Sequence, residues 1–324
     1  MTRIGYHASH EQFAPSHLLR LVRQAGEAGF QSGMCSDHYM PWSEEQGHSG
    51  FAWSWLGAAL EATSLSYGVV TVPGGWRYHP AIVAQAAATL AEMYPGRFWI
   101  APGSGEMLNE HIVGGYWPDK AERNARLLEA VEIIRALWAG ETVTSRGRIL
   151  VEEAKLYSRP ATPPKIVGAA LSPETARWMG GWADGLITTV SERASMQKII
   201  DAFREGGGES KPIYLQAQLS YAATDEAALE AAWHQWRMVM LPSPVLGELR
   251  LPSQFDLLAG SLTKDHCRQR MRISADIDQH IRWLEEDIEM GFEEINLHNV
   301  CREEQERFID VFGQSVLPRL ATEG

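Results

Sequence analysis

An acid–imidazole pair with an aromatic neighbour is the first feature of this sequence that could do chemistry. Asp37 and His38 stand side by side, and Trp42 follows shortly after them. Histidine changes its charge near neutral pH, which suits it to take a proton from an alcohol or to return one. A plainer interpretation also stands, in which Asp37 makes an Asx-turn at a strand end and His38 is a surface residue.

A further carboxylic acid, Glu106, directly follows the run Gly103-Ser104-Gly105. Glycine lets a backbone approach a ligand closely, and a carboxyl group at such a place could act as a general acid. The run resembles part of a dinucleotide-binding fingerprint but lacks the third glycine, so it only weakly indicates a Rossmann fold. The alternative is a loop glutamate in solvent.

A turn that precedes a predicted helix could hold a phosphate group. Ser172 would be the N-cap of that helix and Pro173 its first residue, with Leu171 and Thr175 on either side. The N–H groups at a helix start can bind phosphate, although most such caps bind nothing. The candidate basic partners are Lys198, Arg250 and Arg270, each of which could equally be an ordinary surface charge.

These residues need a scaffold that brings them together, and the chain predicts one. Eight strand-like segments alternate with amphipathic helical stretches, which favours a closed (β/α)8 TIM barrel over an open doubly wound sheet. The predicted strands are 4–6, 32–35, 66–72, 98–101, 165–170, 185–189, 213–220 and 294–298. The predicted helices are 16–28, 55–63, 81–93, 121–137, 173–180, 194–205, 226–239, 277–290 and 303–316.

Barrel enzymes carry their chemistry at the C-terminal ends of the strands. Apart from the three basic residues, the residues singled out above follow predicted strands, so we expect them to meet at one mouth. The strand ends carry Asp37 and His38, Thr71, then Ser104, Glu106 and Asn109, then Ser172, and finally His298.

A single barrel domain over residues 1–324 is the favoured organisation, because the alternation is not interrupted by a linker. Two insertions are expected. Residues 140–164 predict a hairpin, whereas 241–266 are rich in Pro, Leu and Ser and show no helical period. A segment of that length beside a barrel mouth could act as a lid.

Composition excludes several classes of protein. The 41 acidic residues outnumber the 29 basic ones, and a net charge of −12 excludes a general nucleic-acid or anionic-membrane binder. Three cysteines without metal-ligand spacing predict neither a disulfide framework nor a metal site. No apolar run reaches the ~20 residues of a membrane span and no signal-like pattern is present, so the expected location is cytoplasmic. Some of the twelve tryptophans are expected to line a pocket for a planar ligand.

Several short motifs in a shared order give the chain a family resemblance. They are Gln12-Phe13-Ala14-Pro15, Ser36-Asp37-His38 with Pro41-Trp42, Arg77-Tyr78 with Pro80, Gly103-Ser104-Gly105-Glu106 with Leu108-Asn109-Glu110, Ala183-Asp184-Gly185 and Leu317-Pro318-Arg319-Leu320. With these motifs the chain resembles the luciferase-like oxidoreductases over essentially its whole length. Within that family it is most similar to the deazaflavin-dependent glucose-6-phosphate dehydrogenase branch.

The resemblance implies a TIM barrel with a flavin-type ring in its mouth, usually in a homodimer. It implies that His38 is the base that removes a hydroxyl proton and that Glu106 is the acid at the ring. Asp37 would help to place ring and substrate, and Trp42 would stabilise the reacting complex, with Trp76 a weaker candidate for the same pocket.

The same resemblance implies a set of cofactor-binding residues. Ser104 and Asn109 would hydrogen-bond the ring, with Thr71 nearby, and a strained non-proline cis peptide at Gly68–Val69 would support it. The phosphate-holding turn would be formed by Leu171, Ser172 and Thr175.

Departures from the branch matter for cofactor and substrate. Arg250 lies where the dehydrogenases have a Lys-His pair, while Lys198 and Arg270 fall at the positions of two other phosphate partners. Leu171-Ser172 replaces a Gly-Gly pair, and a serine there is common in members that use flavin mononucleotide (FMN). We therefore expect FMN as the cofactor, with the deazaflavin coenzyme F-420 as the alternative.

Four functional hypotheses remain open at this point. The first is a flavin-dependent oxidoreductase that transfers a hydride between a small organic substrate and the ring, with His38 and Glu106 shuttling protons. The second is a deazaflavin-dependent sugar-phosphate dehydrogenase, the third a flavin-binding protein without turnover, and the fourth a cofactor-free sugar-phosphate isomerase.

Overall fold

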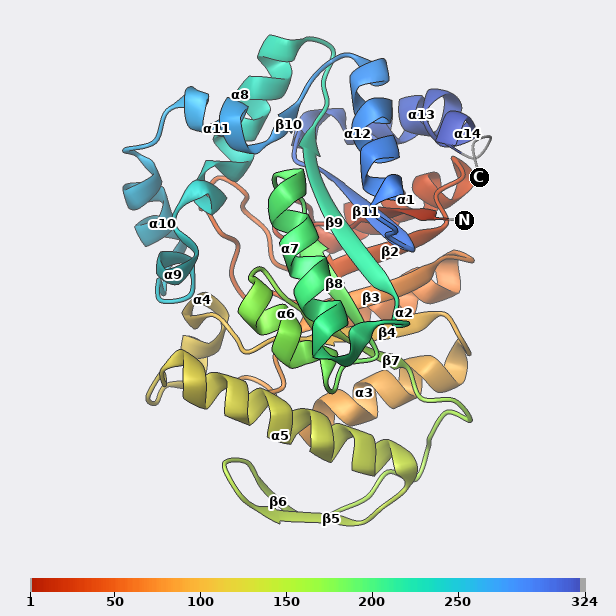
Figure 1. The fold of residues 1–324 in the computed structure, drawn as a ribbon, viewed down its shortest axis with the longest axis vertical. Coiled ribbons are helices and arrows are strands. Elements are labelled where there is room, and N and C mark those ends of the chain that lie inside the picture. The colour runs from red at the N-terminus through yellow and green to blue at the C-terminus, as the bar shows by residue number, and fades with distance from the viewer. Residues whose placement is uncertain (1, 321–324) are drawn as a thin grey trace.

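Eight parallel strands close into a barrel in the computed structural model of this protein, which describes residues 2–320 (Figure 1). The barrel strands are β1 (Arg3–His7), β2 (Ser32–Ser36), β3 (Ser66–Thr71), β4 (Phe98–Pro102), β7 (Lys165–Ala169), β8 (Gly185–Thr189), β9 (Ile213–Ser220) and β11 (Glu294–Asn299). Each pairs in parallel with the next, and β11 pairs with β1 to close the ring. The predicted (β/α)8 barrel is therefore confirmed.

Helices follow the strands and cover the outside of the barrel (Figure 1). They are α1 (Pro15–Glu27), α2 (Ala52–Ala62), α3 (Pro80–Met93), α5 (Lys120–Ala139), α6 (Pro173–Gly180), α7 (Arg193–Phe203), α8 (Asp225–Trp236), α12 (Ile277–Glu289) and α13 (Gln305–Ser315). Shorter helices are α4 (Met107–Glu110) and α14 (Leu317–Leu320), and single turns are η1 (His111–Val113), η2 (Arg204–Gly208), η3 (Arg237–Met240) and η4 (Arg302–Glu304). Element ends lie within about three residues of the predicted ones, as is usual for helix boundaries.

Local sequence explains where the longest helix begins and ends. The side chain of Asp119 accepts a hydrogen bond from the N–H of Glu122 and so caps the start of α5. At the other end Gly140 takes a left-handed conformation, with φ of 91°, which favours glycine. Between them, Leu127, Val131 and other apolar side chains are buried against the barrel.

Large side chains fill the inside of the barrel. Trp99 of β4 and Tyr214 of β9 lie with ring centroids 5.3 Å apart, and Met34 and Ile187 pack against them. A Cβ added to Gly68 of β3 would lie 2.0 Å from the indole of Trp99, so only glycine leaves room for this ring. The barrel is thus a packed core, and its chemistry has to be at its mouth.

The predicted cis peptide at Gly68–Val69 is wrong, because residues 2–320 contain no cis peptide bond. The pair lies inside β3, where Gly68 is in register with Met34 on one side and Trp99 on the other. Regular pairing on both edges requires an extended trans backbone. The side chain of Val69 belongs to the cluster between strands and helices, which lies away from the inside of the barrel.

The first insertion forms the predicted hairpin. Strands β5 (Val143–Arg146) and β6 (Leu150–Ala154) pair antiparallel and lie beyond α5, at the lower edge of Figure 1.

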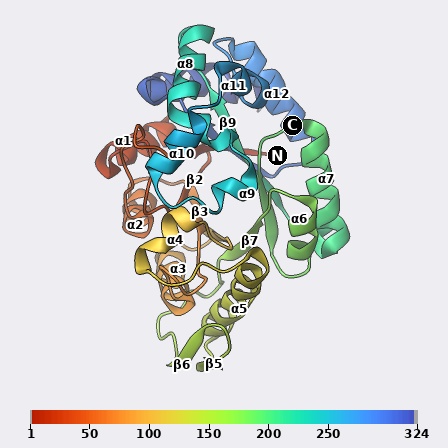
Figure 2. The same cartoon turned by 90° about the vertical axis from the view of Figure 1, so that its left-hand side faces the viewer.

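The second insertion contains more helical structure than its sequence suggested. Residues 241–266 contain α9 (Ser243–Leu246), α10 (Pro252–Ala259) and the start of α11 (Lys264–Arg270). A short strand β10 (Arg272–Ile273) follows α11 and pairs with β9. Helices this short have too few turns to show a period in the sequence. Figure 2 shows α4, α9 and α10 in front of the barrel strands. The second insertion therefore covers the end of the barrel at which α4 follows β4.

None of the helices within residues 2–320 is long and apolar enough to cross a membrane.

Candidate active site

The predicted catalytic residues converge at the mouth of the barrel. His38 follows β2, Glu106 follows β4, and a third residue, Glu11, follows β1. Nδ1 of His38 lies 3.7 Å from Oε1 of Glu11 and 3.3 Å from the carbonyl oxygen of Met40. Glu11 is almost completely buried, and His38 keeps a small exposed surface. The mouth therefore places an imidazole between a buried carboxyl group and the solvent side.

Glu106 interacts electrostatically with both His38 and Glu11. Burial raises the pKa of its carboxyl group above the usual value, His38 and Lys120 oppose the rise, and Glu11 adds to it. A raised pKa keeps a carboxyl group protonated closer to neutral pH, which is what a general acid requires. Because Glu106 interacts with both His38 and Glu11, the structure brings the two predicted proton carriers into one site.

Asp37 is held from several sides by the protein itself. The hydroxyl of Thr71 donates to its Oδ2 at 3.0 Å, while Tyr78 OH and Nη1 of Arg77 donate to Oδ1 at 3.2 and 3.3 Å. Nη2 of Arg77 also donates to the Asp37 carbonyl at 2.6 Å. Asp37 and Thr71 therefore fix the strand end that carries His38.

Arg77 links Asp37 to a second buried acid that the sequence marked only through the resemblance. The backbone N–H of Arg77 donates to Oε2 of Glu110 at 3.0 Å, and its Nε lies 3.4 Å from Oε1. Burial raises the pKa of Glu110 to about 7, against the opposing effect of Arg77. Its place in the short helix after β4 is the signal that could have identified it.

Asn109 and Ser104 already have partners within the protein. Oδ1 of Asn109 accepts from the backbone N–H of Tyr39 at 2.8 Å and of Met40 at 3.3 Å, so it holds the turn after His38. The hydroxyl of Ser104 accepts from Nζ of Lys120 at 2.6 Å. The predicted contacts of both residues with a ring stay predictions.

Trp42 connects the mouth to the second insertion. Its ring centroid lies 5.0 Å from that of His38, at a tilted angle of 53°. It lies 5.4 Å from that of Phe255 in α10, and only this second pair is edge to face. The N–H of Met107 donates to the carbonyl of Gly247 at 3.1 Å. The insertion is thus docked on the residues next to His38 and Glu106.

Three buried histidines beside this site were not singled out as a group from the sequence. The rings of His7 and His298 lie 4.3 Å apart, and Nε2 of His298 is 3.1 Å from Oε1 of Gln12. Burial lowers the pKa of His10 to about 4 and that of His298 to about 3, so both are neutral at pH 7. The strand-end rule found His298, and it could also have found His7 at the end of β1 and His10 just after it.

The predicted phosphate turn has the expected local structure. Ser172 is the N-cap of α6, its hydroxyl accepts from the N–H of Thr175 at 3.3 Å, and Pro173 is the first helical residue. Leu171 is exposed before it. The first N–H groups of a helix have no partner within the helix, so this turn can hold an anionic group.

The three predicted basic partners lie on different segments of the described chain. Lys198 is exposed on α7, and Nη1 of Arg270 donates to the carbonyl of Met240 at 2.7 Å. Arg250 lines a small cavity with Trp76 and Trp117, to which neither Lys198 nor Arg270 contributes. In Figure 2, α7 and α4 lie on opposite sides of α9.

The mouth fits a flavin-type or deazaflavin-type group. Such a group needs polar contacts for a ring and a site for a phosphate. Nδ1 of His7 and Oγ1 of Thr188, at the ends of β1 and β8, are buried without a hydrogen-bond partner in the described chain. The turn at Ser172 could hold the phosphate. Residues 2–320 contain no group of three His, Cys, Asp or Glu side chains that could hold a metal ion.

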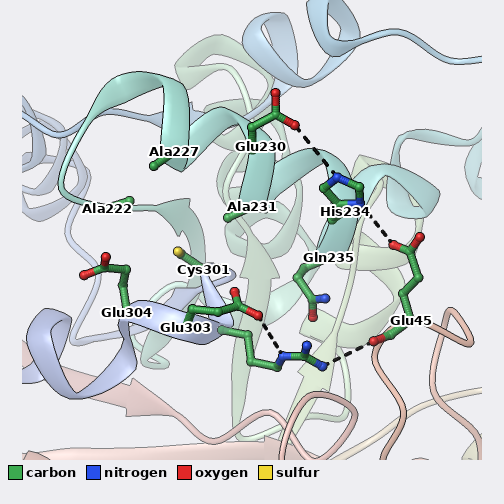
Figure 3. A pocket seen from close by; sticks show the side chains of 11 residues that line it. Glu45, Ala222, Ala227, Glu230, Ala231, His234, Gln235, Cys301, Glu303 and Glu304 are labelled. Atoms are coloured by element: carbon green, nitrogen blue, oxygen red, sulfur yellow. Dashed lines mark hydrogen bonds and ion pairs between the residues drawn. The ribbon is translucent and has the colours of Figure 1, made fainter.

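A separate hollow of about 630 Å³ lies between α8 and η4 (Figure 3). Its rim carries His234, which lies 3.5 Å from Glu45 and 3.8 Å from Glu230. Its lining includes Cys301, whose pKa is raised by burial to about 11, so the thiol is protonated. Neither His38 nor Glu106 lines this hollow, so the candidate reaction site is distinct from it.

Comparison with known proteins identifies relatives over the whole chain. The sequence model of the family described as "Luciferase-like monooxygenase" matches residues 1–292. The chain is 37% identical to an F420-dependent glucose-6-phosphate dehydrogenase from Beutenbergia cavernae, over 99% of this chain and 98% of that protein. It is 36% identical to the enzyme of the same name from Kribbella flavida, over 98% of each chain.

Solved structures show the same fold. An F420-dependent secondary alcohol dehydrogenase in complex with an F420-acetone adduct has a TM-score of 0.88 and 31% identity, with 98% of each chain covered. A coenzyme F420-dependent tetrahydromethanopterin reductase from Methanopyrus kandleri has a TM-score of 0.77 at 20% identity, over 98% of this chain and 99% of that one. At that identity the second likeness concerns the fold alone.

Proposed function

Since the chain belongs to the luciferase-like family of oxidoreductases, we propose that it is a deazaflavin (F420)-dependent dehydrogenase that oxidises a hydroxyl group. Its curated relatives and its most similar solved neighbour named above are F420-dependent by name. They favour the deazaflavin alternative over the FMN that the serine of the Ser172 turn suggested. A serine at that N-cap suits any phosphate group, so it does not discriminate between the two cofactors.

One arrangement carries the proposal: His38 lies beside the buried carboxyl group of Glu11, in electrostatic contact with a Glu106 whose pKa is raised. When bound, the deazaflavin would supply a ring that accepts a hydride from the carbon that bears the hydroxyl. His38 would accept the hydroxyl proton, and Glu106 would hold a proton in the same site. Thr71 and Asn109 would keep the backbone around His38 in place.

The docked insertion would exclude water from this site. Trp42 lies between His38 and Phe255 of α10, so the indole covers the imidazole from the side of the insertion. The turn at Ser172 would hold the cofactor phosphate at the far side of the mouth.

The test is cofactor binding followed by turnover. Purified protein is titrated with F420 and with FMN, and loss of deazaflavin absorbance is followed with 2-propanol and with glucose 6-phosphate. We expect F420 to bind and to be reduced, and His38→Ala to lose ~10²-fold or more in rate if His38 is a general base. His17→Ala, at a half-exposed histidine paired with Glu306, is the control and should keep the wild-type rate.

Other results would support a different function. Binding of FMN alone would return the function to the flavin-dependent reading, and cofactor binding without turnover would indicate a flavin-binding protein. Aldose–ketose conversion without any cofactor would indicate an isomerase. An unchanged rate in His38→Ala would remove the role of His38 as base.

Oxidation of glucose 6-phosphate is the second candidate activity. The names of the curated relatives favour it, whereas the name of the solved neighbour favours a secondary alcohol. The phosphate site that the resemblance implies at Lys198, Arg250 and Arg270 stays a prediction. Initial rates with the two substrates decide between them.

The homodimer and the cytoplasmic location expected from the sequence stay predictions. Sedimentation of the purified protein tests the first of these.

A further inference from the structure

One buried cation lies between two buried carboxyl groups beside the candidate active site. Arg77, in the loop after β3, has Asp37 on one side and Glu110 of α4 on the other. Neither carboxyl side chain has exposed surface, and the side chain of Arg77 keeps only 7% of its own. A single positive charge cannot balance two negative ones in such a place, so the two acids compete for it.

Asp37 holds the larger share of this guanidinium. Nη2 of Arg77 donates to the Asp37 carbonyl oxygen at 2.6 Å, and Nη1 donates to Oδ1 at 3.3 Å. The hydroxyls of Tyr78 and Thr71 add one hydrogen bond to each carboxyl oxygen of Asp37. Asp37 thus has the donors that an ionised carboxylate needs.

Glu110 receives fewer donors than Asp37. Its Oε2 accepts the backbone N–H of Arg77 at 3.0 Å, whereas its Oε1 is buried without a hydrogen-bond partner within residues 2–320. Nε of Arg77, 3.4 Å from that oxygen, is likewise buried and makes no hydrogen bond there. A buried carboxylate with so few donors is costly, and a proton on it removes the cost. Burial also raises the pKa of Glu110 to about 7, so Glu110 carries a proton below that pH.

These three residues contact the segments that carry both proposed proton carriers. Asp37 directly precedes His38, while Glu110 ends the short helix α4, whose N-cap is Glu106. Arg77 therefore joins the strand end that carries His38 to the helix that begins after Glu106. A shift of its guanidinium would change how the two proton carriers lie relative to each other.

We propose that Arg77 and Glu110 are positioning residues of the candidate active site: protonated Glu110 leaves the guanidinium of Arg77 to Asp37, and this contact sets the place of His38. When Glu110 loses its proton, it becomes a second anion beside Arg77, attracts Nε toward Oε1 and weakens the hold on Asp37. One proton thus regulates the site without touching the reacting atoms. The consequence for turnover rests on the proposed function.

Other titratable or charged groups around Glu110 come from several segments. Tyr78 lies against Arg77, and burial raises the pKa of its hydroxyl far above neutral pH. His111 follows Glu110 in the chain, and Arg250 of the second insertion lines the same small cavity as both. Histidine is the residue type that ordinarily changes its charge near neutral pH, so the test includes a His111→Gln variant.

Hydrogen exchange of the cofactor-free protein tests the proposal without turnover. Protection of residues 37–40 is measured on either side of pH 7, relative to the exchange rates of an unfolded chain at each pH. We expect the wild type to lose protection about threefold or more as the pH rises past 7, as a weakened hydrogen bond predicts. Glu110→Gln should keep the low-pH protection throughout, and His111→Gln should follow the wild type.

Glu294→Gln is the matched control. Glu294 is also a fully buried glutamate that pairs with an arginine, Arg3, but it begins β11 at the end of the barrel opposite the mouth. This variant should keep the pH trend of the wild type in residues 37–40, whatever it does to the stability of the whole protein.

Arg77→Lys tests the positioning role in turnover. Lysine keeps the charge but lacks the planar fork that reaches Asp37 with two nitrogen atoms. With F420 and 2-propanol we expect kcat to fall about tenfold or more while KM for the alcohol changes by less than about twofold, because a misplaced proton carrier affects the reacting state and not ground-state binding. Rates are referred to the folded fraction from circular dichroism, so that a loss of fold is not counted as a loss of positioning.

Three results would overturn the proposal: no pH trend in the wild type, the same trend in Glu110→Gln, or a wild-type kcat in Arg77→Lys. A trend that disappears in His111→Gln and persists in Glu110→Gln would assign the titration to His111 instead. Failure of the proposed function would show as absence of F420 binding or reduction by the wild type, and the exchange result would still decide the role of Glu110.

Discussion

At the scale of single residues, two carboxyl groups at the mouth of the barrel have different surroundings. Asp37 accepts three hydrogen bonds from side chains of the protein, one of them from a positively charged arginine. Glu106 has no such donor among the described residues, and burial raises its pKa. Two acids in different environments can take different parts in one reaction, one as a fixed charge and one as a proton carrier.

Glu11 should help to set the pKa of Glu106, and the variant Glu11→Gln tests this. The charge of Glu11 raises the pKa of Glu106, so its removal should lower that pKa. Glu106 would then lose its proton at lower pH, and the alkaline limb of the pH profile of kcat should move toward acid.

Glu44→Gln, at an exposed residue of the loop after β2, is the control and should leave the limb in place. A limb that stays fixed in Glu11→Gln would show that Glu106 is not the proton donor or does not sense Glu11.

At the scale of elements, the second insertion is held on the mouth by both apolar and polar contacts. Phe255 is fully buried and meets Trp42 edge to face. Asp256, its neighbour in α10, accepts from the hydroxyl of Ser43 at 2.6 Å and from the N–H of Glu44 at 3.1 Å. These contacts tie α10 to the loop that also carries Trp42.

Phe255→Ala should release α10 and loosen Trp42. Loss of a buried phenylalanine side chain typically destabilises a protein by about 3–5 kcal/mol. Here it should mainly weaken the contact of the second insertion with the mouth of the barrel. We expect faster hydrogen exchange in α10 and in the loop after β2, together with a lower kcat/KM. Leu257→Ala, on the same helix but exposed, should change neither. Equal exchange rates in both variants would contradict the docking role of Phe255.

Packing inside the barrel should make the stability of the protein sensitive to a substitution at Gly68. Gly68→Ala would place a methyl group against the indole of Trp99, and overpacking of this kind typically destabilises by about 1–3 kcal/mol or more. Gly57→Ala in α2 is the control: its nearest neighbour, Leu90, is 3.9 Å away, and alanine is the better helix former. Urea unfolding should show a lower midpoint for the first variant and an equal or higher one for the second.

The parts that were predictable from sequence are those governed by local pattern. Strand and helix alternation identified the barrel, and the rule that chemistry follows strands located His38 and Glu106 before any contact was known. The link from Arg77 to Glu110 joins residues 33 positions apart, and no local signal encodes that distance.

Long-range packing explains the error at Gly68. Gly68 was interpreted as part of a strained peptide, although its role is to admit the ring of Trp99 from the neighbouring strand. The grouping of Arg250 with Lys198 and Arg270 at one phosphate site stays a prediction, and the course of the insertion also places Arg250 and Trp117 in the lining of one small cavity.

At the scale of the whole molecule, buried neutral histidines make stability depend on pH. Burial lowers the pKa of His10 and His280 to about 4 and that of His298 to about 3, and it lowers that of His7 as well. Below pH 6.5 these histidines therefore bind more protons in the unfolded chain than in the folded one, and their contribution to the free energy of unfolding falls as the pH falls.

Urea unfolding should show this loss between about pH 6.5 and 4, with a slope of about 1.4 kcal/mol per pH unit for each histidine that titrates only when unfolded. His280→Gln, away from the mouth on α12, should flatten the slope by about one histidine. A slope unchanged in this variant would show that His280 is protonated in the folded protein.

The pairing of β1 with β11 also has a consequence for how the protein is made. The first strand of the ring, Arg3–His7, hydrogen-bonds to the last one, Glu294–Asn299. A ribosome adds about 5–20 residues per second, so the nascent β1 waits roughly 15–60 s before its partner exists. During that time one edge of β1 stays unpaired, and unpaired edges are where chains aggregate. Expression of this protein should therefore depend on a chaperone that shields the growing barrel until translation is complete.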